Sequence, residues 1–297
     1  MRIFYGWTLF FIAVAAIMVG GLFFAVLLCA ASFMAGKEYI AIARAKGIKP
    51  SARIVLGMII AFFVIAALPS VPGLNLPWTF SLEHFPILLT VGMCIAFFRL
   101  LFRNEKPPAT IADIATTILG FIYVGWMPSH LVLLRNLNPS GMEITTNPLQ
   151  QPGLAYVWCS LFIVWATDVF AYYAGKKFGK HLLFPQISPK KTIEGAIGGL
   201  IAAIFFATLV VYLSDYYLFP SHPFHYQLWQ APLMAIIVSL ACQLGDLCES
   251  LLKRDAGVKD SGSIIPGHGG FLDRGDSLIF GGAISYYWIC LIVLGLL

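Results

Sequence analysis

Long apolar runs, separated by short charged segments, recur along the whole of this 297-residue chain. A helix needs about 20 mostly apolar residues to cross the roughly 30 Å hydrocarbon core of a bilayer. Runs near or above this length occupy residues 54–76, 114–134, 154–174, 195–213, 229–252 and 277–297, and a shorter run at residues 85–98 reaches it by including residues 100–102. The pattern predicts an all-α, polytopic integral membrane protein built as a helical bundle.

The first apolar run, residues 7–36, is longer than a single crossing requires. As one helix it would measure about 45 Å, and Gly20 followed by Gly21 offers a place for a break. We therefore expect eight or nine transmembrane helices. The run also exceeds the apolar core of a signal peptide, about 7–15 residues, so we expect it to remain as an anchor.

Composition agrees with this assignment and excludes a large water-soluble domain. Charged residues make up 11% of the chain and hydrophobic residues 59%, against roughly 25% charged residues in soluble domains. The net charge of +5 does not indicate a nucleic-acid partner, because the basic residues lie in short loops without an RNA-binding or helix-turn-helix motif. The six cysteines are scattered through apolar runs, and we interpret them as small core residues.

Lysine and arginine residues set the expected orientation. Loops that are rich in them alternate along the chain with loops that hold none or one, and by the positive-inside rule the basic loops are cytoplasmic. The basic loops are residues 37–53, 99–106, 176–191 and 253–274. All of the candidate chemistry adjoins these loops, so we expect an active site on the cytoplasmic side of a bacterial inner (plasma) membrane.

The densest polar segment of the chain is residues 245–276, between two apolar runs. Asp246 and Glu249 begin a polar stripe, since residues three and four apart share one face of a helix. Asp273 and Asp276 are three apart at the start of the final run, so both carboxylates can face one point, and hard oxygen ligands of this kind suit Mg²⁺. The alternative is an ion-pair network that closes the bundle.

The same segment carries features suited to a phosphate ligand. Lys253, Arg254 and Lys259 provide positive charge, and glycines on both sides of His268 let backbone amides approach a ligand closely. His268 itself is open between an acid or base, a ligand and a structural loop residue.

A second polar segment, residues 187–199, is a loop that leads into an apolar run. Ser188, Lys190 and Lys191 lie just before the expected helix N-terminus, where unpaired amides and the helix dipole favour anions such as a polyphosphate. A loop facing anionic lipids is the alternative.

Asp168 stands about two turns inside a third apolar run. Helical spacing places Asp168, Ala171, Tyr172 and Gly175 on one face, which we expect to look inward. The alternative is a packing seam of small residues at Gly175 and Gly179, with Asp168 hydrogen-bonded to a neighbouring helix.

These polar segments contain short motifs in a fixed order. They are residues 168–172, 175–180, 188–192, 194–195, 250–254, 259–262, 266–270 and 273–276. Together they resemble the signature of the phosphatidate cytidylyltransferase (CDP-diglyceride synthase) family over roughly residues 155–285. One departure is Gly275, where the family usually carries a larger, mostly apolar residue; glycine weakens a helix by about 0.5–1 kcal/mol relative to alanine.

The resemblance implies an Mg²⁺-dependent, in-line reaction of CTP with phosphatidic acid, which gives CDP-diacylglycerol and pyrophosphate. It also favours nine spans, and therefore a division of the first run into two helices. We expect residues 1–150 to form the N-terminal transmembrane helices and residues 151–297 the catalytic transmembrane region. CTP, phosphatidic acid and the bilayer are the expected partners, with no nucleic acid and with a homodimer as the expected assembly.

The resemblance also implies roles for individual residues. The expected ligands of Mg²⁺, and of a second cation if two are used, are Asp246, Asp273 and Asp276. The residues expected to bind or orient the nucleotide are Asp168, Ser188, Lys190, Lys191 and Glu194. The residues expected to position phosphatidate or pyrophosphate, or to assist the reaction, are Lys253, Arg254, Lys259 and His268.

Two other functions fit parts of the pattern. A CTP-dependent lipid kinase acting on a polyprenol or phytol would need the same metal and phosphate groups, but the full signature of residues 253–276 favours the cytidylyltransferase. An ion-coupled transporter would use Asp168 and Asp246 as a relay. It predicts acids spread across the membrane depth and an inverted repeat, whereas the acids here gather at one face.

Overall fold

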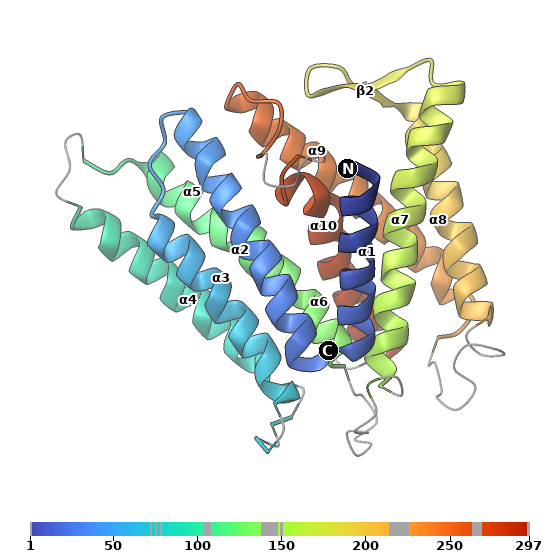
Figure 1. The fold of residues 1–297 in the computed structure, drawn as a ribbon, viewed down its shortest axis with the longest axis horizontal. Coiled ribbons are helices and arrows are strands. Elements are labelled where there is room, and N and C mark those ends of the chain that lie inside the picture. The colour runs from blue at the N-terminus through green and yellow to red at the C-terminus, as the bar shows by residue number, and fades with distance from the viewer. Residues whose placement is uncertain are drawn as a thin grey trace. The chain divides into compact units, whose positions relative to one another are not determined.

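The computed structural model describes residues 2–71, 73–74, 76–77, 79–103, 108–137, 148, 151–213, 226–262 and 269–295. Almost all of its regular structure is helical (Figure 1). The helices are α1 (Arg2–Val19), α2 (Gly21–Ala45), α3 (Ala52–Ala67), α4 (Phe80–Leu101), α5 (Ile111–Phe121), α6 (Met127–Arg135), α7 (Pro152–Phe178), α8 (Ile193–Leu213), α9 (Gln230–Asp255) and α10 (Leu272–Trp288).

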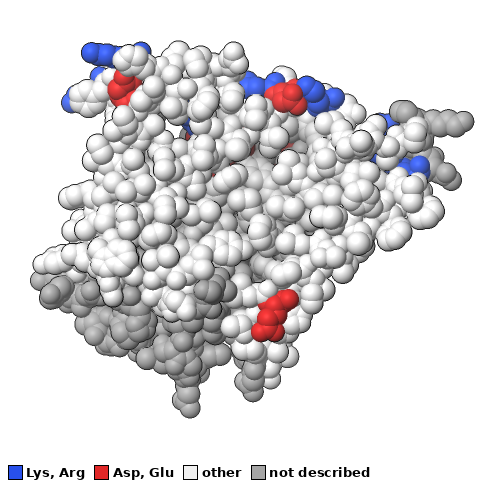
Figure 2. Space-filling model, turned by 180° about the vertical axis from the view of Figure 1, so that it is seen from behind, with Lys and Arg blue, Asp and Glu red and all other residues white. Residues whose placement is uncertain are grey.

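Within the described residues, eight helical stretches are long and apolar enough to cross a membrane. One of them joins α5 and α6 through a π-helical turn, Ile122–Trp126. The surface agrees with a lipid environment: the face in Figure 2 carries few charged side chains among its described residues, and Leu101 and Ile111 are 74% and 86% exposed. The predicted all-α, polytopic fold is confirmed, and the chain is an integral membrane protein.

The first apolar run is divided where the paired glycines predict it. Gly20 and Gly21 have φ angles of +67° and +53°, in the left-handed region that glycine adopts without steric cost. The fully buried Arg135, at the end of α6, donates from Nε to the Ile17 carbonyl at 2.8 Å and from Nη2 to the Met18 carbonyl at 3.3 Å. It thereby satisfies two of the carbonyls that the end of α1 leaves without intrahelical partners.

The chain packs as two compact units. The first contains Met1–Asn136 and Leu252–Gly275, and the second contains Leu137–Leu251 and Asp276–Leu297. Helices α9 and α10 therefore each contribute residues to both units. The boundary expected at residue 150 separates the N-terminal helices from the region expected to be catalytic. It describes function rather than packing, and it stays a prediction.

In the first unit α3 packs against α2, α4, α5 and α6 (Figure 1). Its core-facing side chains include Val55, Ile59 and Phe62, none of which is exposed. Helix α5 begins with a capping box, in which the Thr110 side chain accepts from the Asp113 amide and the Asp113 side chain accepts from the Thr110 amide. The Asp113 carboxylate also accepts a hydrogen bond from the Lys49 amide, in the loop between α2 and α3.

In the second unit α7 packs closely along α8, because small residues line the contact. A Cβ atom added at Gly195 would lie 2.8 Å from the Ala171 carbonyl oxygen, and one at Gly199 would lie 2.6 Å from the Thr167 carbonyl oxygen. The two helices are joined by a hairpin of β1 (Leu182–Phe184) and β2 (Ser188–Thr192), which pair antiparallel (Figure 1).

This close packing predicts the effect of adding one methyl group. Gly199→Ala should lower the thermal unfolding temperature of the detergent-purified protein, because overpacking costs about 1–3 kcal/mol. Gly57→Ala is the matched control, since a Cβ atom at Gly57 in α3 meets nothing within 4 Å; it should leave stability unchanged or raise it by up to about 1 kcal/mol. Equal unfolding temperatures for the two variants would contradict the tight contact.

Candidate active site

Carboxylates from three helices of the second unit form an acidic cluster, consisting of Asp168 of α7, Asp246 and Glu249 of α9, and Asp276 of α10. Asp276 interacts electrostatically with the other three, and Asp168 interacts with Asp246. Glu249 is fully buried. The sequence places Glu249 in the polar stripe of α9 but gives no reason to assign it to the site, because burial depends on the neighbouring helices.

Two glycines let α9 and α10 approach closely enough to form this cluster. A Cβ atom at Gly245 would lie 2.7 Å from the carbonyl oxygen of Asp276, and one at Gly281 would lie 2.6 Å from Sγ of Cys242. Because Gly245 directly precedes Asp246, the contact brings Asp246 to the turn of α10 that carries Asp276. The expected meeting of these two residues therefore has a packing basis.

A hydrogen bond ties Asp168 to α10. Ser277 Oγ donates to Asp168 Oδ1 at 3.1 Å. Gly175 and Gly179 lie against Thr192, since Cβ atoms added there would lie 3.0 Å from its Oγ1 and 2.7 Å from its Cγ2. Both features of the packing-seam alternative are therefore present, and they coexist with a place for Asp168 in the acidic cluster.

The expected inward orientation of Tyr172 is wrong, because its side chain is 62% exposed. The face of α7 that packs on α8 contains Thr167 and Ala171. Tyr172 lies about 100° around the helix from Ala171, which places it at the edge of the packed face.

Lys191 brings positive charge to the acidic cluster, with its Nζ 2.6 Å from Asp246 Oδ2. The sequence predicts a loop here, whereas the structure forms strand β2 (Ser188–Thr192). Neighbouring residues of a strand point to opposite faces, so Lys190 is directed away from Lys191, and it is exposed. The two lysines are therefore not equivalent. Local charge spacing alone does not reveal this difference.

The remaining residues expected to bind substrate in this segment hold the hairpin. Ser188 is opposite Phe184 in the β-ladder. Glu194 accepts from the amides of Lys180 at 3.0 Å and His181 at 3.2 Å, and its Oε1 lies 2.7 Å from His181 Nδ1. The sequence gives no role to His181, whose contact with Glu194 exists only once the hairpin closes. Thr192 Oγ1 accepts from the Gly195 amide at 3.1 Å and caps α8.

In the first unit, Asp273, in the first turn of α10, contacts described residues from both ends of the polar segment that precedes this helix. Lys253 Nζ lies 2.6 Å from Asp273 Oδ1. Asp273 Oδ2 accepts from the Ser261 amide at 3.0 Å, from Ser261 Oγ at 2.8 Å and from the Gly270 amide at 2.9 Å. Gly269 has a φ angle of +84°, and a Cβ atom there would lie 2.9 Å from Asp273 Oδ2. A glycine is therefore required beside this carboxylate.

A second buried carboxylate, Glu38 of α2, supports the same loop. It accepts from the amides of Phe271 at 3.0 Å and Leu272 at 2.8 Å. Ser261 Oγ lies 3.2 Å from Glu38 Oε2, and its one proton is shared between this oxygen and the closer Asp273 Oδ2. The first turn of a helix has amides without intrahelical partners, and its dipole favours a negative charge. Glu38 thus caps α10 from a distant part of the chain, a role that the sequence does not predict. The available signal is that Glu38 is the only acidic residue among the first 82.

The other expected residues of this segment are placed as follows. Arg254 and Lys259 are exposed, and Arg254 Nη1 donates to the Val258 carbonyl at 3.4 Å. His268 lies outside the described residues. A Cβ atom at Gly275 would meet nothing within 4 Å, so the position leaves room for the larger residue that the resemblance leads us to expect.

The three expected metal ligands occupy different surroundings. Asp246 and Asp276 belong to the acidic cluster, whereas Asp273 is one turn earlier in α10 and is held by Lys253 and the polar loop. Among the residues that the structure describes, no three His, Cys, Asp or Glu side chains are grouped closely enough to hold a metal ion.

The cap predicts that Glu38 stabilises the fold. Glu38→Gln should lower the unfolding temperature, because an amide group cannot accept at both of its positions and a buried donor left unpaired costs about 1–3 kcal/mol. Glu83→Gln is the control, since Glu83 is an exposed glutamate of α4. If both variants unfold at the wild-type temperature in detergent, the cap does not contribute to stability.

Comparisons with known proteins place these observations in a family. The model of the Cytidylyltransferase family matches residues 1–292. The chain is 35% identical over 298 aligned positions to a phosphatidate cytidylyltransferase of Synechocystis sp., covering 95% of this chain and 93% of that protein. It is 34% identical to that of Bacillus subtilis, over 76% and 80% of the two chains. It is 35% identical to the chloroplastic phosphatidate cytidylyltransferase 4 of Arabidopsis thaliana, over 92% and 68%. The chain belongs to the Cytidylyltransferase family.

Proposed function

We propose that the protein transfers CMP from CTP to phosphatidic acid, forming CDP-diacylglycerol and pyrophosphate. The observation that carries the proposal is the acidic cluster with Lys191 beside Asp246 at 2.6 Å. The family match and the names of the relatives point to the same reaction. The proposed location of the site is the cytoplasmic face of a bacterial inner membrane, and a homodimer stays a prediction.

The reaction brings two anions together, and the site must reduce their repulsion. An oxygen of the phosphatidate monoester attacks the α-phosphorus of CTP, a new P–O bond forms, and the bond to the β-phosphate breaks as pyrophosphate leaves with the electron pair. No covalent enzyme intermediate is required. Lys191 lies beside the cluster, and we propose that nucleotide phosphates replace Asp246 as its partner when CTP binds.

The donor set fits a magnesium ion. Proteins usually bind Mg²⁺ through one or two carboxylates together with waters and substrate phosphates, so Asp246 and Asp276 are sufficient protein ligands. When bound, Mg²⁺ would neutralise charge on the reacting phosphates and on the leaving pyrophosphate. Asp273 is the third ligand expected from the sequence. Its contacts with Lys253 and Ser261 favour a positioning role, in which it fixes the loop and the start of α10.

Product analysis tests the reaction. Purified protein in detergent should convert phosphatidate and labelled CTP, with Mg²⁺, to a CMP-linked lipid and pyrophosphate. A CTP-dependent lipid kinase would instead release CDP and phosphorylate a lipid alcohol. Detection of CDP without a CMP-linked lipid would replace the proposed function by the kinase.

Asp276→Asn should reduce turnover at least about a hundredfold, the usual scale for removing a preorganised charged group from an active site. The unfolding temperature should stay close to that of the wild type. Asp255→Asn is the matched control, because Asp255 forms an exposed ion pair with Lys46 at 2.8 Å; it should retain turnover. Normal turnover of Asp276→Asn at saturating Mg²⁺ would remove Asp276 from the proposed metal site.

Lys191→Ala should chiefly raise the KM for CTP, by about tenfold if one charge-assisted contact worth about 1.4 kcal/mol is lost. Lys190→Ala should have a smaller effect, because β2 directs Lys190 to the opposite face. Steady-state rates at varied CTP concentration measure both. An unchanged KM in Lys191→Ala, or a larger change in Lys190→Ala, would contradict the assignment.

A further inference from the structure

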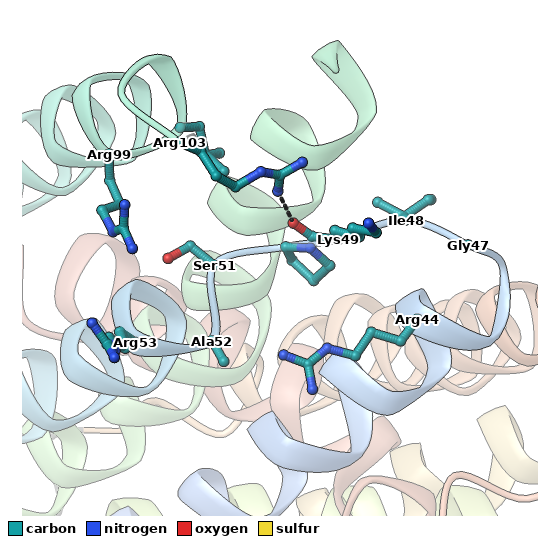
Figure 3. Close-up of a pocket in the computed structure, with 11 residues that line it drawn as sticks. Arg44, Gly47, Ile48, Lys49, Ser51, Ala52, Arg53, Arg99 and Arg103 are labelled. Atoms are coloured by element: carbon teal, nitrogen blue, oxygen red, sulfur yellow. Dashed lines mark hydrogen bonds between the residues drawn. The ribbon is translucent and has the colours of Figure 1, made fainter. Parts of the chain in front are cut away.

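A cavity of about 540 Å³ lies in the first unit, where α2, α3 and α4 meet the loop that joins α2 to α3 (Figure 3). Among the eleven described residues that line it, five are basic and none is acidic or aromatic. The five are Arg44, Lys49, Arg53, Arg99 and Arg103. We call this cavity the basic pocket. None of its residues belongs to the acidic cluster or to the signature motifs.

Three of the five charges have no counter-ion in the part of the chain that the structure describes. Arg103 pairs with Asp113, with its Nη2 3.2 Å from Asp113 Oδ2. Arg44, Arg53 and Arg99 come from three different helices and have no carboxylate at ion-pair distance among the described residues. Like charges held around one cavity repel each other, so an anion in the pocket would relieve this repulsion.

Hydrogen bonds to neighbouring parts of the first unit hold the loop residues that line the pocket. Asp113 Oδ1 accepts from the Lys49 amide at 2.6 Å, and Thr117 Oγ1 accepts from the Ser51 amide at 3.0 Å. Arg103 Nη1 donates to the Lys49 carbonyl at 3.0 Å, as the dashed line in Figure 3 marks. The loop is therefore fixed to α5 and to Arg103, which follows the end of α4, and less conformational freedom is lost when a ligand binds.

The N-terminus of α3 adds to the positive potential. Helix α3 begins at Ala52 after Ser51, whose side chain makes no capping hydrogen bond. Both residues line the pocket. Together with the guanidinium groups, whose planar donors match phosphate oxygens, the half-buried start of α3 favours a phosphate group.

The surroundings of Arg99 favour a lipid as the source of that phosphate. Next to it at the end of α4, Phe98, Leu101 and the C-cap residue Phe102 are 62%, 74% and 74% exposed. A basic residue among exposed apolar side chains at the end of a membrane-spanning helix is typical of the head-group region. The lining set has no aromatic side chain on which a nucleotide base would stack.

We propose that the basic pocket binds the phosphate group of an anionic phospholipid at the membrane interface, at a site separate from the residues that carry the CTP reaction. The cavity volume lies within the range of about 300–1,000 Å³ that is usual for ligand sites. A free polyphosphate shares the same chemistry, and the experiment distinguishes the two sources.

The test measures binding of fluorescent phosphatidylglycerol to the purified full-length protein in a neutral detergent. The variant Arg44→Gln/Arg53→Gln/Arg99→Gln should bind it at least about tenfold more weakly than the wild type, a loss of about 1.4 kcal/mol. The control variant Lys37→Gln/Lys176→Gln/Lys177→Gln removes the same charge elsewhere and should bind like the wild type. Fluorescent phosphatidylcholine should bind weakly to all three proteins.

Each remaining outcome decides the proposal. Equal loss of lipid binding in the two triple variants would show that the lipid is held by non-specific charge attraction, and this result would overturn the proposal. Displacement of the lipid by millimolar pyrophosphate, with no preference over phosphatidylcholine, would indicate a soluble polyphosphate site instead. If the pocket variant does not fold, the single variant Arg99→Gln decides by the same measurement, with weaker binding supporting the proposal and unchanged binding overturning it. Asp276→Asn should retain lipid binding, so failure of the proposed reaction and failure of this site remain distinguishable.

Discussion

Charge inside a helical membrane protein has to be matched by an opposite charge or by hydrogen bonds, and this requirement organises the polar parts of the chain. Arg135 meets the carbonyls at the end of α1, Glu38 meets the amides at the start of α10, and Asp273 meets Lys253. The acidic cluster differs, because carboxylates of three helices interact with one another and Lys191 forms an ion pair with only one of them, Asp246. A site with this excess of negative charge is suited to receive a divalent cation together with phosphates.

Close helix contacts decide where these charges stand. Gly245 lets the backbone of α10 reach α9, so the position of Asp276 relative to Asp246 follows from the absence of a single Cβ atom. Gly199 has the same effect between α7 and α8, and the hairpin at the end of those helices then carries Lys191 to Asp246. In a bilayer, where apolar side chains gain little by leaving lipid, such small-residue contacts are a principal source of helix association.

Much of the fold was predictable because hydropathy and length determine where a chain can cross a membrane. The break at Gly20–Gly21 was predictable for the same reason, because the first apolar run is longer than one crossing requires. Helical spacing also gave the stripe with Asp246, and the proposed ligand role of Asp246 and Asp276 stays a prediction. The cap by Glu38 could not be predicted, because its partners are 233 and 234 residues away. The difference between Lys190 and Lys191 was also hidden, because it depends on a strand that the sequence presents as a loop.

The cap on α10 has a consequence for biosynthesis. During translation, α2 emerges from the ribosome long before Phe271 and Leu272 exist. Until α10 has formed, the Glu38 carboxylate lacks the amides of Phe271 and Leu272 from which it accepts in the finished protein, and a buried carboxylate without partners is unfavourable. The cap on α10 can therefore form only after the chain has been translated beyond residue 272. A nascent chain that ends before residue 271 would therefore contain α2 but lack both amide partners of Glu38.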